Sequence, residues 1–133
     1  MLLVVSSGIN LTAKADTVDY WRVFYNKKEI REYPLYSKGE ILLKVKDIKE
    51  NDSLTILYFR DTPCSECETN VIVENKQHFI ITQGKGQGTF NPIKISVFDL
   101  LVKADRDYSY VYYYEVNGNI NTPKIPLFKI KLE

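Results

Sequence analysis

Short apolar runs alternate with polar turn residues along most of the chain. Within several runs the apolar residues recur at every second position; Ile41, Leu43 and Val45, for example, share one face while Lys44 and Lys46 point away from it. This period of two is typical of half-buried β-strands. The pattern predicts strands at 18–25, 29–33, 41–48, 54–59, 71–73, 79–81, 93–97, 108–116 and 125–132.

Two of these runs carry further information about the sheets. The run 54–59 is apolar on both faces, which predicts a central strand. The runs 71–73 and 79–81 are joined by Glu74-Asn75-Lys76-Gln77, which predicts a hairpin. In the last strand we expect Phe128, Ile130 and Leu132 inside, with Lys129 and Lys131 outside.

The segment 99–104 is the best helix candidate. Asp99 can cap it, and Leu100, Leu101 and Ala104 fall on one side. A longer helix that begins at Asn91-Pro92 is the alternative, because the apolar residues from 93 onward also fit helical spacing.

The segment 84–88, Gly-Lys-Gly-Gln-Gly, predicts a mobile hairpin loop. It lacks the residue order of a phosphate-binding loop.

This many short strands in 133 residues predict one all-β domain, a sandwich of two antiparallel sheets with at most one short helix near 99–104. We expect an immunoglobulin-like sandwich, and a jelly-roll or small barrel is the alternative. The domain spans 16–133. Residues 1–15 resemble part of a signal peptide, since an apolar start is followed by Ala13-Lys14-Ala15, a small-x-small cleavage pattern. The alternatives for this segment are a first strand at 2–5 or a frayed terminus.

Charge and hydropathy narrow the functional classes. The chain has 18 Lys and Arg against 17 Asp and Glu, and these are scattered rather than grouped. A basic face that neutralises phosphates is therefore not expected, which argues against nucleic-acid binding. No run approaches the roughly 20 apolar residues of a transmembrane helix. The signal-like segment instead predicts export to the periplasm or cell surface.

Cys64-Ser65-Glu66-Cys67 is the most distinctive motif, and three kinds of chemistry fit it. A local disulfide is favoured in an oxidising compartment. Redox catalysis, with Cys64 as nucleophile and Cys67 as resolving thiol, is the second. The apolar run leading into the motif resembles a thioredoxin-type site, but 69–73 is strand-like where that family has a helix, and the acidic neighbours disfavour a thiolate.

The third kind is a zinc site. Cys64, Cys67 and His78 supply three candidate ligands, and Asp61, Glu66 or Glu68 could be the fourth. A second Cys or His pair of the usual spacing is missing from the sequence, so no cofactor is expected unless zinc binds here.

The strand 108–116 places four tyrosines on one face: Tyr108, Tyr110, Tyr112 and Tyr114. Exposed, they would form an aromatic platform for a glycan or a partner protein. Because the opposite face carries Ser109 and Glu115, we expect the four tyrosines to face the core.

No Ser-His-Asp set or carboxylate pair suggests a hydrolase. The sequence therefore predicts an exported, non-enzymatic β-sandwich that binds a protein or glycan at the bacterial cell envelope. A thiol-disulfide redox protein or a small zinc-stabilised module, using Cys64 and Cys67, is the alternative.

Overall fold

The computed structural model describes residues 19–34, 39–104 and 107–133. The signal-like segment 1–15 lies outside these residues. The described part contains ten strands, a 3-10 turn at Val45–Asp47 (η1) and one α-helix, α2, at Val97–Lys103. The strands are β2 (Tyr20–Tyr25), β3 (Lys28–Pro34), β4 (Gly39–Leu43), β5 (Ser53–Phe59), β6 (Glu68–Glu74), β7 (Ile80–Gln87), β8 (Ile93–Ser96), β9 (Tyr108–Asn117), β10 (Ile120–Asn121) and β11 (Ile125–Leu132).

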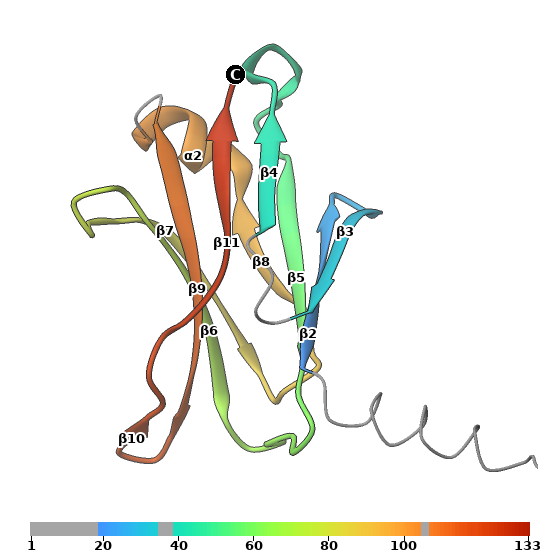
Figure 1. The fold of residues 1–133 in the computed structure, drawn as a ribbon, viewed down its shortest axis with the longest axis vertical. Coiled ribbons are helices and arrows are strands. Elements are labelled where there is room, and N and C mark those ends of the chain that lie inside the picture. Colours follow the sequence, from blue (N-terminus) through green and yellow to red (C-terminus); the bar gives the residue numbers. More distant parts are fainter. Residues whose placement is uncertain (1–18, 35–38, 105–106) are drawn as a thin grey trace, which may run out of the picture.

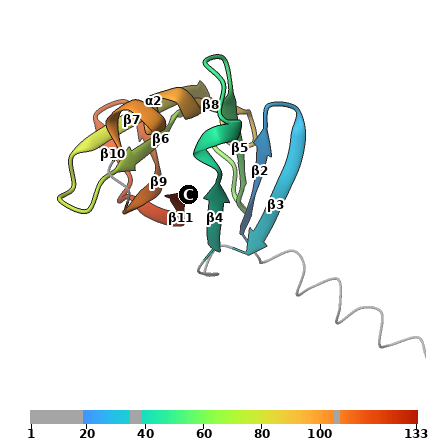
Figure 2. The ribbon, with the colours of Figure 1, turned by 90° about the horizontal axis from the view of Figure 1, so that it is seen from above.

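The strands form two sheets that pack face to face, which confirms the all-β sandwich. One sheet has the order β4-β11-β9-β6-β7, with β10 paired to β9, and the other has the order β3-β2-β5-β8. Figure 1 shows the two layers crossing, and Figure 2 shows them from above with the space between them. The chain passes between the sheets after β3, β4, β5 and β7, and again through α2 after β8.

The core lies between the inner faces of the sheets, and the predicted alternation accounts for most of it. Leu54, Ile56 and Tyr58 of β5 are buried, and β5 lies between β2 and β8 as a central strand. Phe128 and Ile130 of β11 are also buried, as predicted. Aromatic packing closes the core around Trp21, whose ring lies 4.7 Å from that of Tyr33 and 4.6 Å from that of Phe128.

One strand pair departs from the antiparallel sandwich that the sequence predicts. Strand β4 pairs with β11 in parallel, with Gly39 opposite Phe128 and Leu43 opposite Leu132. The strand predicted at 41–48 ends at Leu43, and the chain continues into η1. Parallel neighbours far apart in sequence have no turn signal to identify them, so the pairing was not predictable from local pattern.

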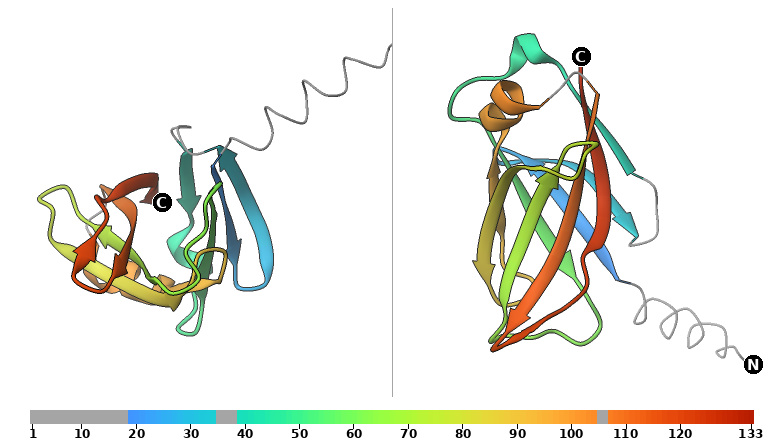
Figure 3. Two further views of the ribbon diagram at one scale, coloured as in Figure 1. Left: turned by 90° about the horizontal axis from the view of Figure 1, so that it is seen from below. Right: turned by 90° about the vertical axis from the view of Figure 1, so that its left-hand side faces the viewer.

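The prediction of a mobile loop at 84–88 is wrong, because strand β7 continues to Gln87 and includes most of this segment. A Cβ atom built on Gly84 would lie 2.1 Å from the carbonyl oxygen of Lys94 in β8. The glycine therefore allows the backbone of β8 to approach β7 closely, a role that glycine also plays within strands. Figure 3 shows β7 and β8 running together along one side of the sandwich.

The predicted short helix is confirmed, but it begins earlier than 99. Its N-cap is Ser96, whose side chain accepts a hydrogen bond from the Asp99 amide. Asp99 instead accepts a hydrogen bond from the Thr82 hydroxyl in β7. The helix lies at one end of the sandwich (Figure 1), and no helix in the described residues has the length and apolarity to cross a bilayer.

Candidate functional site

Cys64 and Cys67 form a disulfide in the loop between β5 and β6, with their Cα atoms 5.5 Å apart. Cys67 is buried and Cys64 is half-buried. The loop lies at the end of the sandwich opposite α2 (Figure 1). Of the three kinds of chemistry that the motif allows, the structure therefore contains the local disulfide. The bond lies in the loop that connects the two sheets.

Backbone hydrogen bonds hold the cysteine loop to the loop that follows β7. The amide of Gly88 donates to the Cys67 carbonyl at 2.8 Å, and the amide of Thr89 donates to the Cys64 carbonyl at 3.0 Å. The Thr89 hydroxyl also accepts from the Cys64 amide at 2.8 Å. Gly88 has φ +85°, and a Cβ there would lie 3.0 Å from the Ser65 carbonyl, so this contact requires glycine. The cysteines are therefore positioned by contacts that do not depend on the S–S bond.

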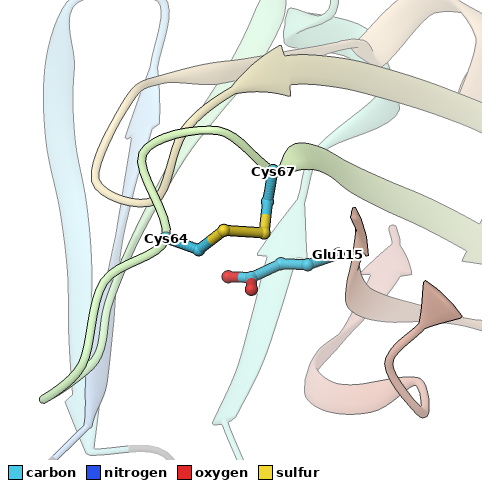
Figure 4. A group of neighbouring side chains, drawn as sticks. All are labelled: Cys64, Cys67 and Glu115. Atoms are coloured by element: carbon cyan, nitrogen blue, oxygen red, sulfur yellow. A yellow bond between two sulfur atoms is a disulfide. The ribbon is translucent and has the colours of Figure 1, made fainter. Parts of the chain in front are cut away.

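The carboxylate of Glu115 points from β9 toward the disulfide (Figure 4). It is buried and accepts two hydrogen bonds from Arg60, Nη2 to Oε1 at 2.7 Å and Nε to Oε2 at 3.2 Å. Oε2 also accepts from the Tyr113 hydroxyl at 2.7 Å and lies 3.1 Å from the Thr89 hydroxyl. A buried carboxylate is costly unless it is paired and hydrogen-bonded, and Glu115 is both.

The phenol of Tyr113 lies inside this cluster. Burial, together with the hydrogen bond to Glu115, raises the pKa of Tyr113 far above the ordinary value. The phenol is therefore a hydrogen-bond donor and not a base at any physiological pH. Its ring packs on Tyr58, with ring centroids 4.4 Å apart.

One sulfur from each cysteine and one carboxylate oxygen of Glu115 lie within 4.8 Å of one another. We call Cys64, Cys67, Glu115 and Arg60 the disulfide site. His78 does not belong to it. All seven residues of β6 separate His78 from Cys67, and a strand of that length spans roughly 23 Å. The zinc ligand set Cys64, Cys67 and His78 is therefore not brought together, because the hairpin carries His78 to the far end of β6.

His78 instead belongs to a second buried-carboxylate cluster. Glu74 at the end of β6 accepts from Lys124 Nζ at 2.6 Å and lies 3.2 Å from His78 Nδ1. Burial opposes the ionisation of Glu74, but the hydrogen bonds from Lys124 and His78 outweigh it and hold its pKa below the ordinary value. Glu74 therefore stays ionised at neutral pH.

The prediction that the four tyrosines of β9 face the core is wrong. The buried face of β9 carries Ser109, Val111, Tyr113 and Glu115, whereas Tyr108, Tyr110, Tyr112 and Tyr114 are half-buried on the outer face. The reason is that Glu115 is neutralised inside by Arg60, which removes the cost that the sequence argument assigned to an inward glutamate. We call the outer surface formed by these four tyrosines the tyrosine face.

Lysines border the tyrosine face and lie over two of its rings. Lys129 and Lys131 lie 4.3 and 5.3 Å from the ring centroid of Tyr108, and Lys124 lies 4.8 Å from that of Tyr112. Lys124 is paired with Glu74, whereas Lys129 and Lys131 form no ion pair with any carboxylate that the structure describes. Glu40 accepts from the Tyr108 hydroxyl at 2.9 Å.

Sequence reasoning missed Glu115 and Arg60 as partners of the cysteines. They are 55 positions apart, and no local pattern links them to the motif. The only available signal was the single acidic residue in a tyrosine-rich strand. Comparison of the chain with protein-family models, with curated proteins and with solved structures finds no significant match.

Proposed function

We propose that the protein is an exported, non-enzymatic binding module of the bacterial cell envelope, and that its tyrosine face binds a partner protein. The outward orientation of Tyr108, Tyr110, Tyr112 and Tyr114 is the observation that carries the proposal. Tyrosine is enriched at protein interfaces because it combines a large apolar surface with a polar end. The Cys64–Cys67 disulfide is compatible with an oxidising compartment and supports export.

The cations on the tyrosine face favour a protein over a glycan. A sugar ring that stacks on an aromatic side chain needs a free ring face. An ammonium group within about 6 Å of a ring centroid occupies that face. Lys129 occupies the ring face of Tyr108 and Lys124 that of Tyr112, so these two rings are not free for a sugar to stack on. Since Lys129 and Lys131 form no ion pair among the described residues, a partner surface with acidic groups would complement them.

The strand order supports an immunoglobulin-like version of the sandwich. Strands β6, β9 and β11 are neighbours in one sheet, and β2, β5 and β8 are neighbours in the other. In sequence order these correspond to the C, F and G strands and to the A, B and E strands of that fold. The connection through α2 joins the two sheets between β8 and β9.

Site-specific photo-crosslinking tests the proposal in the producing cells. A photoreactive phenylalanine analogue would replace Tyr110 or Tyr114, whose rings carry no lysine among the described contacts, and in the control it would replace Thr55 on the four-stranded sheet. We expect one discrete protein adduct from the tyrosine-face positions and none from the control. The adduct should weaken when Lys129 and Lys131 are both changed to glutamate.

Two other results would contradict this assignment. Binding of purified envelope polysaccharide that is lost in Tyr110→Ala would identify the occupant as a glycan. Identical adducts from all three positions, or none, would remove the tyrosine face as a binding surface. Export is tested separately, because the chain isolated from the envelope fraction should begin near Asp16; a chain that retains Met1 would contradict it.

A further inference from the structure

We infer that the disulfide site, once Cys64 and Cys67 are reduced, binds a divalent cation of the zinc class through both thiolates and the carboxylate of Glu115. This metal site does not depend on the binding function proposed above. Figure 4 shows the two cysteine side chains and the Glu115 carboxylate directed toward one another, and their ligand atoms lie within 4.8 Å. Thiolate and carboxylate are both established zinc ligands.

The ligands are held in place before any metal arrives. Four hydrogen bonds tie Cys64 and Cys67 to Gly88 and Thr89, and none of them involves sulfur. Glu115 is held from the other side by Arg60 and Tyr113. Reduction of the disulfide therefore leaves two sulfurs beside a fixed carboxylate, and the sulfurs then have to move apart to bind one metal ion. Zinc–sulfur distances of about 2.3 Å require shifts of the size that side-chain rotation supplies.

The charges of the reduced site match a divalent cation. Two thiolates and Glu115 would carry three negative charges around a largely buried point, and Arg60 neutralises only one of them. The remaining two match the charge of Zn²⁺. Without a metal the cysteines would remain neutral thiols, because unpaired negative charges at a buried site are costly.

The fourth coordination position is available to water. Three protein ligands leave one position of a tetrahedral zinc ion open. Cys64 is only half-buried, which gives solvent a path to the site. Thr69 lies opposite Glu115 in the β6–β9 pairing, and its buried hydroxyl has no hydrogen-bond partner among the described residues.

The step from disulfide to metal site needs one reductant. A dithiol, either a protein of the thiol-disulfide oxidoreductase class or a small molecule, attacks the S–S bond and leaves as its own disulfide. Two electrons and two protons pass to Cys64 and Cys67, which become thiols. Zinc then replaces both thiol protons, which are released to water.

The test is zinc binding by the full chain, oxidised and reduced, with Co²⁺ as a spectroscopic substitute. We expect the reduced protein to bind one equivalent with sulfur-to-cobalt charge-transfer absorption, and the oxidised protein to bind none. Glu115→Gln should weaken binding at least tenfold, roughly the lower limit for disturbing even the outer shell of a metal site. Glu66 is a carboxylate within the same loop, and Glu66→Gln should leave the metal affinity unchanged. Glu115→Cys, which supplies a third thiolate, should keep the affinity that Glu115→Gln loses.

X-ray absorption at the zinc edge of the wild-type protein gives an answer that does not depend on the variants folding. We expect two sulfur ligands, with oxygen completing the shell. Absence of binding by the reduced, folded protein would overturn the inference. So would a shell without sulfur, or equal effects of the Glu115 and Glu66 substitutions.

Discussion

Arg60 neutralises the buried carboxylate of Glu115 at the end of the sandwich that carries the disulfide. Arg22 and Glu29 form a pair of nearly identical geometry on the surface. Their distances are 2.6 and 3.1 Å, against 2.7 and 3.2 Å for Arg60 and Glu115. The side chain of Glu29 is 34% exposed, whereas that of Glu115 is 4% exposed. The two pairs therefore isolate the effect of burial on one interaction.

We expect Arg60→Ala to lower the free energy of unfolding by about 3 kcal/mol, because it leaves Glu115 buried without a counter-charge. Arg22→Ala, the control, should cost much less, because Glu29 is solvated without its partner. Urea denaturation of both variants and of the wild type measures the difference. Equal losses would mean that water reaches Glu115 and that its burial does not govern the stability of the disulfide site.

At the level of single residues, the sequence indicated the cysteines but not their surroundings. The spacing of Cys64 and Cys67 predicts a local disulfide, and the structure contains it. The position of His78 in a hairpin left a zinc site open, and only the length of β6 excludes that ligand set. Glu115 came to the site through the pairing of β9 with β6, a long-range contact that no local pattern encodes.

Strand β9 shows how far alternation alone predicts an element. The pattern identifies the strand and the two sets of residues that share a face. Deciding which set is buried required weighing four tyrosines against Ser109, Val111, Tyr113 and Glu115, and the partner of Glu115 was unknown. The predicted orientation was therefore reversed even though the element was right. The same limit applies to β7, whose glycines look like a loop until the close approach of β8 is known.

Adjacent tyrosines of β9 give a direct test of its orientation. Tyr113 is 2% exposed and packs on Tyr58, so Tyr113→Ala should cost about 3 kcal/mol or more of stability. Tyr114→Ala, the same change on the outer face, should cost about 1 kcal/mol, the value of a cross-strand contact. Thermal unfolding of the two variants measures the difference. Similar losses would show that the tyrosine face is packed as tightly as the core and is not a free surface.

For the whole molecule, the alternation of apolar and polar residues was sufficient to predict a two-sheet sandwich. Each sheet needs one apolar face, and short strands joined by turns satisfy that need only when two sheets pack together. The parallel pairing of β4 with β11 was not accessible in this way, since it joins strands that are far apart in the sequence, with Gly39 opposite Phe128. Global strand order depends on contacts that local sequence does not specify.

The acid stability of the whole domain should depend on Glu74, which lies on β6 and binds Lys124 from the segment before β11. The folded protein lowers the pKa of Glu74, so its contribution to stability is complete above the unfolded value, near 4.3, and is lost as the pH falls through the folded value. Lys124→Met removes the main partner and should cost about 1 to 3 kcal/mol at pH 7. His78, the other group paired with Glu74, is kept in all proteins.

The difference in unfolding free energy between wild type and Lys124→Met should therefore shrink as the pH falls below the unfolded pKa of Glu74, near 4.3, and vanish once the pH lies below the lowered folded pKa, where Glu74 is protonated in both proteins. Lys129→Met is the matched control, since Lys129 lies over Tyr108 and pairs with no described carboxylate; its effect should not change with pH. Urea titrations at pH 7, 5, 4 and 3 follow both differences. The ammonium of Lys124 also lies 4.8 Å from the ring centroid of Tyr112. A Lys124→Met effect that stays constant across this pH range would mean that Lys124 stabilises the fold by packing on Tyr112 and not through the charge of Glu74.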